Sequence, residues 1–215
     1  MSEEREVGVG PWLGPWPQDD RLDPALLEAG DRRNVVDRYR YWSHDAIVAD
    51  LATRRLGFHV AIENWEHDFN IGSVVRTANA LGAAAFHVVG RRRWNRRGAM
   101  VTDRYQVEHH HADAEALHTW AQTAGEGGAP LRLVAVDNVP GALPLETYDL
   151  PHGCVLVLGQ EGPGITAEML AVCDDVVEIG QHGSTRSMNA GAAAAIVMHA
   201  WVRRHVHHQR PVASG

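Results

Sequence analysis

The sequence predicts an α/β fold in which a parallel sheet carries helices on both faces. From about Gly57 onward, short runs that are apolar throughout alternate with longer segments of helical periodicity. Such strands are typical of parallel sheets, because helices cover both of their faces. Three turns rich in glycine or other small residues also lie where a strand is followed by a helix. Ligands bind at such junctions in α/β proteins, since backbone N–H groups and helix dipoles converge there.

The elements can be placed in order along the chain. Strands are expected over 58–62, 85–89, 131–136, 154–158 and 176–179, and helices over 71–81, 113–123, 166–173 and 188–205. Before them, helices are expected over 22–29 and 35–55, whereas residues 1–20 have no periodicity. These patterns divide the chain into an N-terminal arm with a helical extension (1–56), an α/β domain (57–208) and a flexible tail (209–215).

Composition narrows the class of protein. The 215 residues, of which 45% are hydrophobic and 22% are charged, fit one globular domain with an appendage. No run approaches the roughly 18 apolar residues of a membrane span, and the acidic N-terminus is unlike a secretory signal. Cys154 and Cys173 lie in apolar stretches and are expected to be buried thiols. We therefore expect a cytoplasmic protein that does not insert into a membrane.

Several common sites find no support. The chain has no G-x-G-x-x-G opening the first helix, no Walker loop and no G-x-S-x-G elbow. The 14 histidines include consecutive ones at 109–111, which we expect on a loop where they would not converge on one ion. No metal site is predicted.

Three motifs follow one another in the second part of the chain. The first is N-x-G-x-x-x-R-T-A, which begins at Asn70, and the second is G-x-E-G-x-G, which begins at Gly159 after an apolar strand. The third, "IGQHGSTRSMN", begins at Ile179 and precedes a helix of small residues. Together they resemble the signature motifs of the SpoU/TrmH family of RNA ribose 2′-O-methyltransferases, part of the SPOUT superfamily, over about residues 57–204. Gly180 and Gln181 stand where that family has Pro-Met, and Met188 stands where it has Leu.

The resemblance implies a fold, a cofactor and an assembly. It implies that the C-terminal part of the α/β domain forms a trefoil knot, a rare exception to unknotted topology, and that the protein is a homodimer. It also implies S-adenosyl-L-methionine as methyl donor, without a metal. By position in the motifs, the cofactor-binding residues would be Gly159, Gly162, Gly164, Ile179, Met188 and Asn189. Taken singly, each has an ordinary interpretation as a turn glycine, core residue or helix cap.

Arg76 is the principal candidate for the chemistry. A guanidinium can hold a phosphate and its ribose through two parallel hydrogen bonds, but it stays protonated at neutral pH. We therefore favour positioning and electrostatic assistance over action as a general base. The resemblance adds four residues to the catalytic site: Asn70, Glu161, Ser187 and Asn189. Helix capping is the simpler alternative for Asn70, Ser187 and Asn189.

An arginine cluster follows the second strand and predicts contact with RNA. Its arginines suit phosphates, and the tryptophan among them suits stacking on an unpaired base; a solvated charged loop is the alternative. The residues are Arg91, Arg92, Arg93, Trp94, Arg96 and Arg97. The helices of the N-terminal extension, with their arginines, resemble the short helical arms of tRNA-acting relatives and favour tRNA over rRNA. These arginines are Arg32, Arg33, Arg38 and Arg40.

Two other functions remain open. A non-catalytic SPOUT protein that binds RNA, such as an assembly factor, would share the fold but lose the polar residues of the motifs. A base-methylating SPOUT enzyme would lack the first motif with its Asn70 and Arg76.

Overall fold

The computed structural model describes residues 8–63, 68–90, 94, 99, 102–160, 163–185 and 187–207. The chain divides into two compact units at Arg54–Arg55, two residues before the predicted boundary. The predicted tail at 209–215 lies outside the described residues. Each unit is considered by itself.

The N-terminal unit contains two short helices, α1 (Pro24–Ala29) and α2 (His44–Ala52), and a 3₁₀ turn at Asp37–Tyr39. The prediction of one helix over 35–55 was wrong at its start. Ser43 caps α2 by accepting a hydrogen bond from the Ala46 N–H at 3.2 Å. Tyr41, two residues earlier, has a φ of 62°, which no residue of a right-handed helix adopts. Residues 35–55 therefore form two separate segments joined by a turn.

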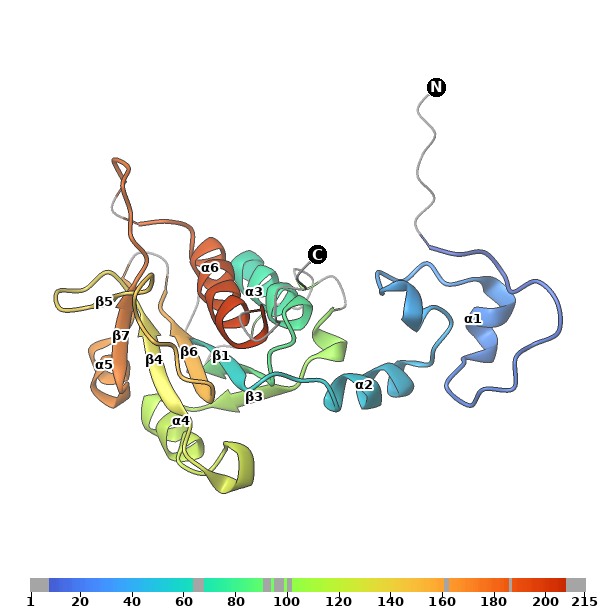
Figure 1. Cartoon of the computed structure of the whole chain (residues 1–215), viewed down its shortest axis with the longest axis horizontal. Helices are drawn as coiled ribbons and strands as arrows, with labels where there is room; N and C mark the ends of the chain where they lie inside the picture. The colour runs from blue at the N-terminus through green and yellow to red at the C-terminus, as the bar shows by residue number, and fades with distance from the viewer. Residues whose placement is uncertain are drawn as a thin grey trace, which may run out of the picture. The chain divides into compact units, whose positions relative to one another are not determined.

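Seven parallel strands form the sheet of the second unit, in the order β3-β2-β1-β6-β4-β7-β5 (Figure 1). The strands are β1 (Phe58–Glu63), β2 (Phe86–Val89), β3 (Glu108–His111), β4 (Arg132–Val136), β5 (Leu143–Pro144), β6 (Cys154–Leu158) and β7 (Asp175–Glu178). Five of them were predicted to within two residues at each end. The two missed strands lie at the edges of the sheet, and β3 contains the histidines that were wrongly expected on a loop.

Helices cover both faces of this sheet. On one face lie α3 (Asp68–Ala80) and α6 (Ala190–Val202), and on the other lie α4 (Ala114–Ala121) and α5 (Ala167–Val172), as Figure 1 shows. Short 3₁₀ turns occupy Thr102–Tyr105 and Glu126–Gly128, and a π turn at Arg203–His207 follows α6. Both cysteines are free thiols, as expected. Within the described part of the chain, no helix is long and apolar enough to span a membrane.

The core consists of two apolar layers, one on each side of the sheet. The layer under α3 and α6 includes Phe58, Ile62, Met198 and Trp201, whereas Leu117 and Met169 belong to the layer under α4 and α5. Residues of β1 and β6 contribute to both layers, because successive side chains of a strand point to opposite faces. A sheet buried in this way is rigid, and it fixes the positions of the loops that leave its strand ends.

Candidate cofactor pocket

A cavity of about 390 Å³ opens at the carboxyl ends of β4, β6 and β7. Ligands of open α/β sheets bind at this edge, and the volume suits a small molecule. We call this cavity the carboxyl-end pocket. Its lining consists of Val136, Asp137, Asn138, Leu158, Gly159, Gln160, Gly164, Ile179, Gln181, Ser187, Met188, Asn189, Ala190 and Ala193.

Residues from the second and third motifs meet in this pocket. The structure brings six predicted site residues into its lining: Gly159, Gly164, Ile179, Ser187, Met188 and Asn189. Glu161 and Gly162 lie outside the described residues. Sequence reasoning missed the polar groups of Asp137, Asn138, Gln160 and Gln181. A signal existed for the first two, because they directly follow a buried strand on the edge where ligands bind.

The glycines of the second motif allow the backbone to fold back on itself. A Cβ at Gly159 would lie less than 3.0 Å from backbone atoms of Gly164 and Ile165, closer than real Cβ atoms come. Gly164 has a φ of +76°, which favours glycine. Gln160 and Gly164 close the turn with two backbone hydrogen bonds of 2.9 and 3.1 Å. The spacing of these glycines therefore has a structural reason in addition to the proposed contact with a ligand.

Asn189 and Asn70 connect the third motif with the first. The Asn189 Nδ2 donates a hydrogen bond to the Asn70 Oδ1 at 3.1 Å. The Asn189 Oδ1 accepts from the Ala192 N–H at 3.2 Å and so caps α6, as the simpler alternative predicted. Asn70 instead lies inside α3 and is 6% exposed, so its predicted alternative as a helix cap is wrong. The pair fixes α3 against the start of α6, beside the pocket.

Arg76 lies on α3 but is not part of the pocket lining. The residue is exposed, six positions along the helix from Asn70. An exposed guanidinium on the helix next to the pocket can meet a large substrate from solvent. The structure therefore keeps Arg76 apart from the residues that would hold a cofactor.

Of the six residues of the predicted RNA-contact cluster, the structure describes Trp94. The five arginines lie outside the described residues. Trp94 is 9% exposed and packs edge-on against Phe86, with ring centroids 6.2 Å apart. A buried indole does not offer a face to an unpaired base, so the structure does not support the predicted stacking role of Trp94.

Three of the four N-terminal arginines make bonds within their own unit. Arg33 donates to both carboxylate oxygens of Asp31, at 2.9 and 2.7 Å, and Arg40 donates to the Arg33 carbonyl at 2.6 Å. The guanidinium of Arg38 lies 4.5 Å from the ring centroid of Tyr39. Arg32 is exposed. Arg33 and Arg40 therefore make bonds within the unit, whereas Arg32 and Arg38 are exposed, and the preference for tRNA stays a prediction.

Four histidines form a second polar group, on the sheet face beneath α4. His59, His87, His109 and His111 come from β1, β2 and β3, and we call them the histidine cluster. The His87 ring has hydrogen-bonding distances of 3.0 Å to His59 and 2.9 Å to His111. Its centroid lies 4.4 Å from that of Trp120 on α4. Among the described residues, no group of three or more His, Cys, Asp or Glu is placed to hold a metal ion.

Burial favours the neutral form of three histidines in the cluster, His59, His87 and His111. It lowers the pKa of His59 to about 4, with a smaller contribution from the nearby His109. Burial also lowers the pKa of His87 well below its ordinary value, and the neighbouring histidines add to this. The pKa of His111 is lowered for the same reason. A neutral ring can donate one hydrogen bond and accept another, so both ring nitrogens of His87 find partners in His59 and His111.

The sheet topology and the pocket define an α/β protein with a small-molecule site at its strand ends. The sequence motifs in that site agree with a family model, because residues 57–199 match the model of the SpoU rRNA Methylase family. The chain belongs to this family.

Relatives and solved structures agree with this assignment. The chain is 28% identical over 186 residues to a protein of Mycobacterium ulcerans named as an uncharacterized tRNA/rRNA methyltransferase, covering 83% of this chain and 57% of that protein. It is 28% identical over 153 residues to the tRNA (guanosine(18)-2′-O)-methyltransferase of Escherichia coli, covering 69% of this chain and 64% of that protein. The chain thus spans about three fifths of the length of these relatives.

Among solved structures, the SpoU methyltransferase AviRb from Streptomyces viridochromogenes in complex with AdoMet is similar, with a TM-score of 0.63 and 26% identity. The match covers 70% of this chain and 58% of AviRb. The TrmH/SpoU tRNA modifying enzyme of A. aeolicus shares the fold, with a TM-score of 0.65 at 19% identity over 75% of this chain and 81% of that one.

Proposed function

We propose that this protein methylates a ribose 2′-hydroxyl in structured RNA, with S-adenosyl-L-methionine as methyl donor. One observation carries the proposal: residues of the second and third motifs line one cavity, and a hydrogen bond between Asn189 and Asn70 joins that cavity to the first motif. Family membership and the AdoMet complex of the similar AviRb support it. A non-catalytic RNA-binding protein would have no need to keep these contacts together.

The lining of the carboxyl-end pocket fits this cofactor. Leu158, Ile179 and Met188 offer an apolar surface to a flat base, while Asn138 and Gln181 offer polar groups to a ribose or an amino acid. Gly159 and Gly164 border the pocket, and the tight turn that their missing Cβ atoms allow presents backbone groups to a ligand. The pocket needs no metal for this binding.

The chemistry divides between the pocket and its edge. When bound, S-adenosyl-L-methionine supplies a methyl group, and its transfer to the 2′-oxygen leaves the demethylated cofactor and releases the hydroxyl proton. Arg76 holds the ribose and its phosphate in line for the transfer, and its fixed charge assists the reaction. The hydrogen bond between Asn70 and Asn189 fixes the position of α3, and with it Arg76, next to the pocket. Ser187 lines the pocket and faces the same space, and we assign Glu161 a supporting position by its place in the motif.

We favour tRNA over rRNA as the substrate class. The support is the similarity to the Escherichia coli enzyme, which is named for a tRNA guanosine. The arginines at 91–93, 96 and 97 would contact the phosphates of this RNA. The name of the Mycobacterium ulcerans relative includes rRNA as well, so both RNA classes belong in the assay.

Assembly, topology and location complete the proposal. We propose a homodimer that uses α6, whose Ile196 is 42% exposed although it is a large apolar residue. We propose that the loops after β6 and β7 form the trefoil knot of the SPOUT superfamily, and that the enzyme works in the cytoplasm. Sedimentation at micromolar concentration should give a mass near twice 23.6 kDa. A monomer that methylates RNA would contradict the dimer.

The decisive experiment combines binding with product mapping. Calorimetry with S-adenosyl-L-homocysteine should show one site per protomer, with the same affinity after treatment with a chelator. Purified protein with labelled S-adenosyl-L-methionine and either total tRNA or rRNA should then give alkali-resistant dinucleotides, since a 2′-O-methyl group blocks alkaline cleavage. Label in alkali-sensitive nucleotides would indicate a base methyltransferase. Cofactor binding without transfer to any RNA would favour the non-catalytic alternative.

A further inference from the structure

The loop that follows β6 carries the second motif and forms one wall of the carboxyl-end pocket. We call its described residues, 159–160 and 163–166, the glycine loop. It leaves the sheet at Gly159, returns on itself through the bridge between Gln160 and Gly164, and enters α5 through Ile165 and Thr166. Any device that fixes Ile165 and Thr166 therefore also fixes the shape of this wall.

Two carboxylates flank the start of the glycine loop. In the sheet, β6 lies between β1 and β4, and Leu158 pairs with Ile62 on one side and Val136 on the other. The next residues along these neighbouring strands are Glu63 and Asp137. Both acids thus stand level with Gly159, on opposite sides of it.

These carboxylates bind consecutive amides of the glycine loop. The Ile165 N–H donates to the Asp137 Oδ2 at 2.8 Å, and the Thr166 N–H donates to the Glu63 Oε2 at 2.9 Å. The Thr166 hydroxyl donates to the other Glu63 oxygen, and the Asn138 N–H donates to the other Asp137 oxygen at 2.7 Å. All four carboxylate oxygens are used, three of them by the loop.

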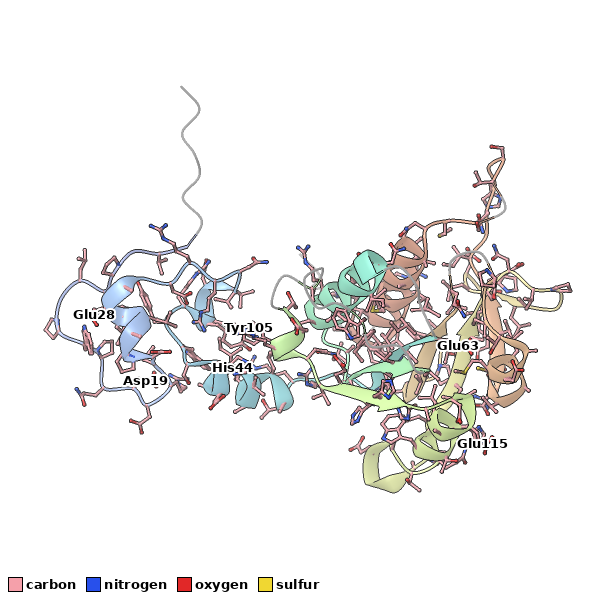
Figure 2. The ribbon with its side chains drawn as sticks, turned by 180° about the vertical axis from the view of Figure 1, so that it is seen from behind. Asp19, Glu28, His44, Glu63, Tyr105 and Glu115 are labelled. Atoms are coloured by element: carbon pink, nitrogen blue, oxygen red, sulfur yellow. The ribbon has the colours of Figure 1, made fainter. Side chains whose placement is uncertain are left out.

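Both carboxylates are closely surrounded by the protein. Glu63 is 4% exposed and lies inside the sheet unit (Figure 2), where a carboxylate is costly unless hydrogen bonds compensate it. Asp137 lies so close to Gly164 that a Cβ there would come within 3.0 Å of the Asp137 Oδ2. The positive φ of Gly164 and the position of Asp137 are therefore coupled.

We propose that Glu63 and Asp137 are positioning residues that clamp the glycine loop from both sides in the shape that binds S-adenosyl-L-methionine. The identity of the ligand rests on the proposed function. The clamp acts before binding: a loop already held in its bound shape loses little conformational freedom when the ligand arrives.

The variant Asp137→Asn tests the clamp at the pocket. Its amide group cannot accept hydrogen bonds from both the Ile165 and the Asn138 N–H, because one side of the amide is itself a donor. The dissociation constant for S-adenosyl-L-homocysteine and the KM for S-adenosyl-L-methionine should each rise about 10-fold or more, while kcat at saturating cofactor stays within about twofold. Wild-type affinity in this variant would overturn the proposal for Asp137.

Asp174→Asn is the matched control. Asp174 also accepts a hydrogen bond from a backbone N–H, that of Leu133 at 2.8 Å, but at the opposite end of the strands. Its thermal midpoint should resemble that of Asp137→Asn, and its cofactor affinity should equal that of the wild type. Equal losses of affinity in both variants would show a general effect on stability and would contradict a clamp.

Amide hydrogen exchange gives a readout that needs neither ligand nor activity. In the free wild-type protein, the Ile165 and Thr166 amides should exchange slowly, as buried donors do. Glu63→Gln keeps one acceptor and should accelerate mainly Thr166, whereas Asp137→Asn should accelerate mainly Ile165. Fast exchange of both amides in the wild type would overturn the clamp, even if a variant failed to fold. A wild type with protected amides but no cofactor binding would instead contradict the proposed function alone.

Discussion

Polar side chains gather at two places on the sheet, in the carboxyl-end pocket and in the histidine cluster. In the pocket, Asp137, Asn138 and Asn189 line a cavity of about 390 Å³. In the cluster, His87 lies at hydrogen-bonding distance from two other histidines, and Trp120 packs against its ring. His87 and His111 are buried within the cluster. In the open pocket, Asp137 is half-buried, and Asn138 and Asn189 are exposed.

Polar side chains of the pocket are open to a ligand, whereas polar side chains of the histidine cluster bond one another. His87 bonds two other histidines of the cluster, and burial favours the neutral form of His59 and His87, as their lowered pKa values show. The pocket instead leaves side chains from β4, β6 and α6 facing one hollow. A dense run of chemically versatile residues therefore says less about a site than a few polar residues at strand ends.

The largest expected effect on cofactor affinity comes from placing a side chain at Gly159, where the backbone packs closely against Gly164 and Ile165. Gly159→Val should abolish cofactor binding, a loss of at least roughly 1,000-fold, because the new Cβ collides with backbone atoms of Gly164 and Ile165 and forces the turn apart. Gly183→Ala is the control: a Cβ there meets nothing within 4 Å, so affinity should be unchanged. Calorimetry with S-adenosyl-L-homocysteine measures both. Normal binding by the Gly159 variant would show that this turn is not part of the site.

Arg76 tests whether the chemistry extends beyond the pocket. Arg76→Ala should lower the single-turnover methylation rate by roughly 100- to 1,000-fold, or about 3–4 kcal/mol, since it removes a charge-assisted contact made with the RNA. Cofactor affinity should stay near that of the wild type, because Arg76 does not line the cavity. Arg76→Lys should recover little activity, as an ammonium cannot form the planar two-pronged contact.

Arg104→Ala, which removes a guanidinium from the turn at Thr102–Tyr105, is a suitable control for general loss of charge. A near-normal rate in Arg76→Ala would refute the assignment of Arg76, even if the protein proved to be a methyltransferase.

Much of the sheet and of the pocket could be predicted from the sequence, whereas the histidine strand and the contacts of Asp137 depend on packing. Apolar runs predict the parallel sheet, and the resemblance to the SpoU/TrmH motifs places Gly159, Ile179 and Asn189 in one site. The strand β3 was missed because three histidines in a row have none of the apolar character of a buried strand, and only Trp120 and the neighbouring strands make that polarity acceptable. Asp137 was missed because its role depends on which strands are neighbours, and a single sequence does not show the strand order.

The histidine cluster should make stability fall as the solution becomes acidic. His59 and His87 have a lower pKa in the folded than in the unfolded state, so between pH 6.5 and about 4 the unfolded chain binds more protons. The free energy of unfolding should therefore fall with decreasing pH, by about 1.4 kcal/mol per pH unit for each such histidine. Urea denaturation from pH 8 to pH 4 measures this slope.

His59→Phe should make the slope shallower, because it removes one of these titrating groups while keeping a flat ring beside Trp120. A control in His44→Phe, whose imidazole is exposed on α2, should leave the slope unchanged. An unchanged slope in His59→Phe would mean that the cluster does not govern the acid response.

The smallest effect is expected for Asn189, whose side chain both caps α6 and lines the pocket. Asn189→Ala removes the cap of α6 and leaves the buried Asn70 oxygen without this donor, which should cost about 1–2 kcal/mol of unfolding free energy. Asp113→Ala removes the corresponding cap of α4, where the side chain accepts from the Ala116 N–H at 2.9 Å, and should cost about 1 kcal/mol. Only Asn189→Ala should also weaken cofactor binding, because only Asn189 lines the pocket. A double-mutant cycle with Asn70→Ala should give a coupling of about 0.5–1.5 kcal/mol in stability. If the two caps behaved alike in both measurements, Asn189 would be a helix cap and nothing more, and the bond between the first and third motifs would have no role in the site.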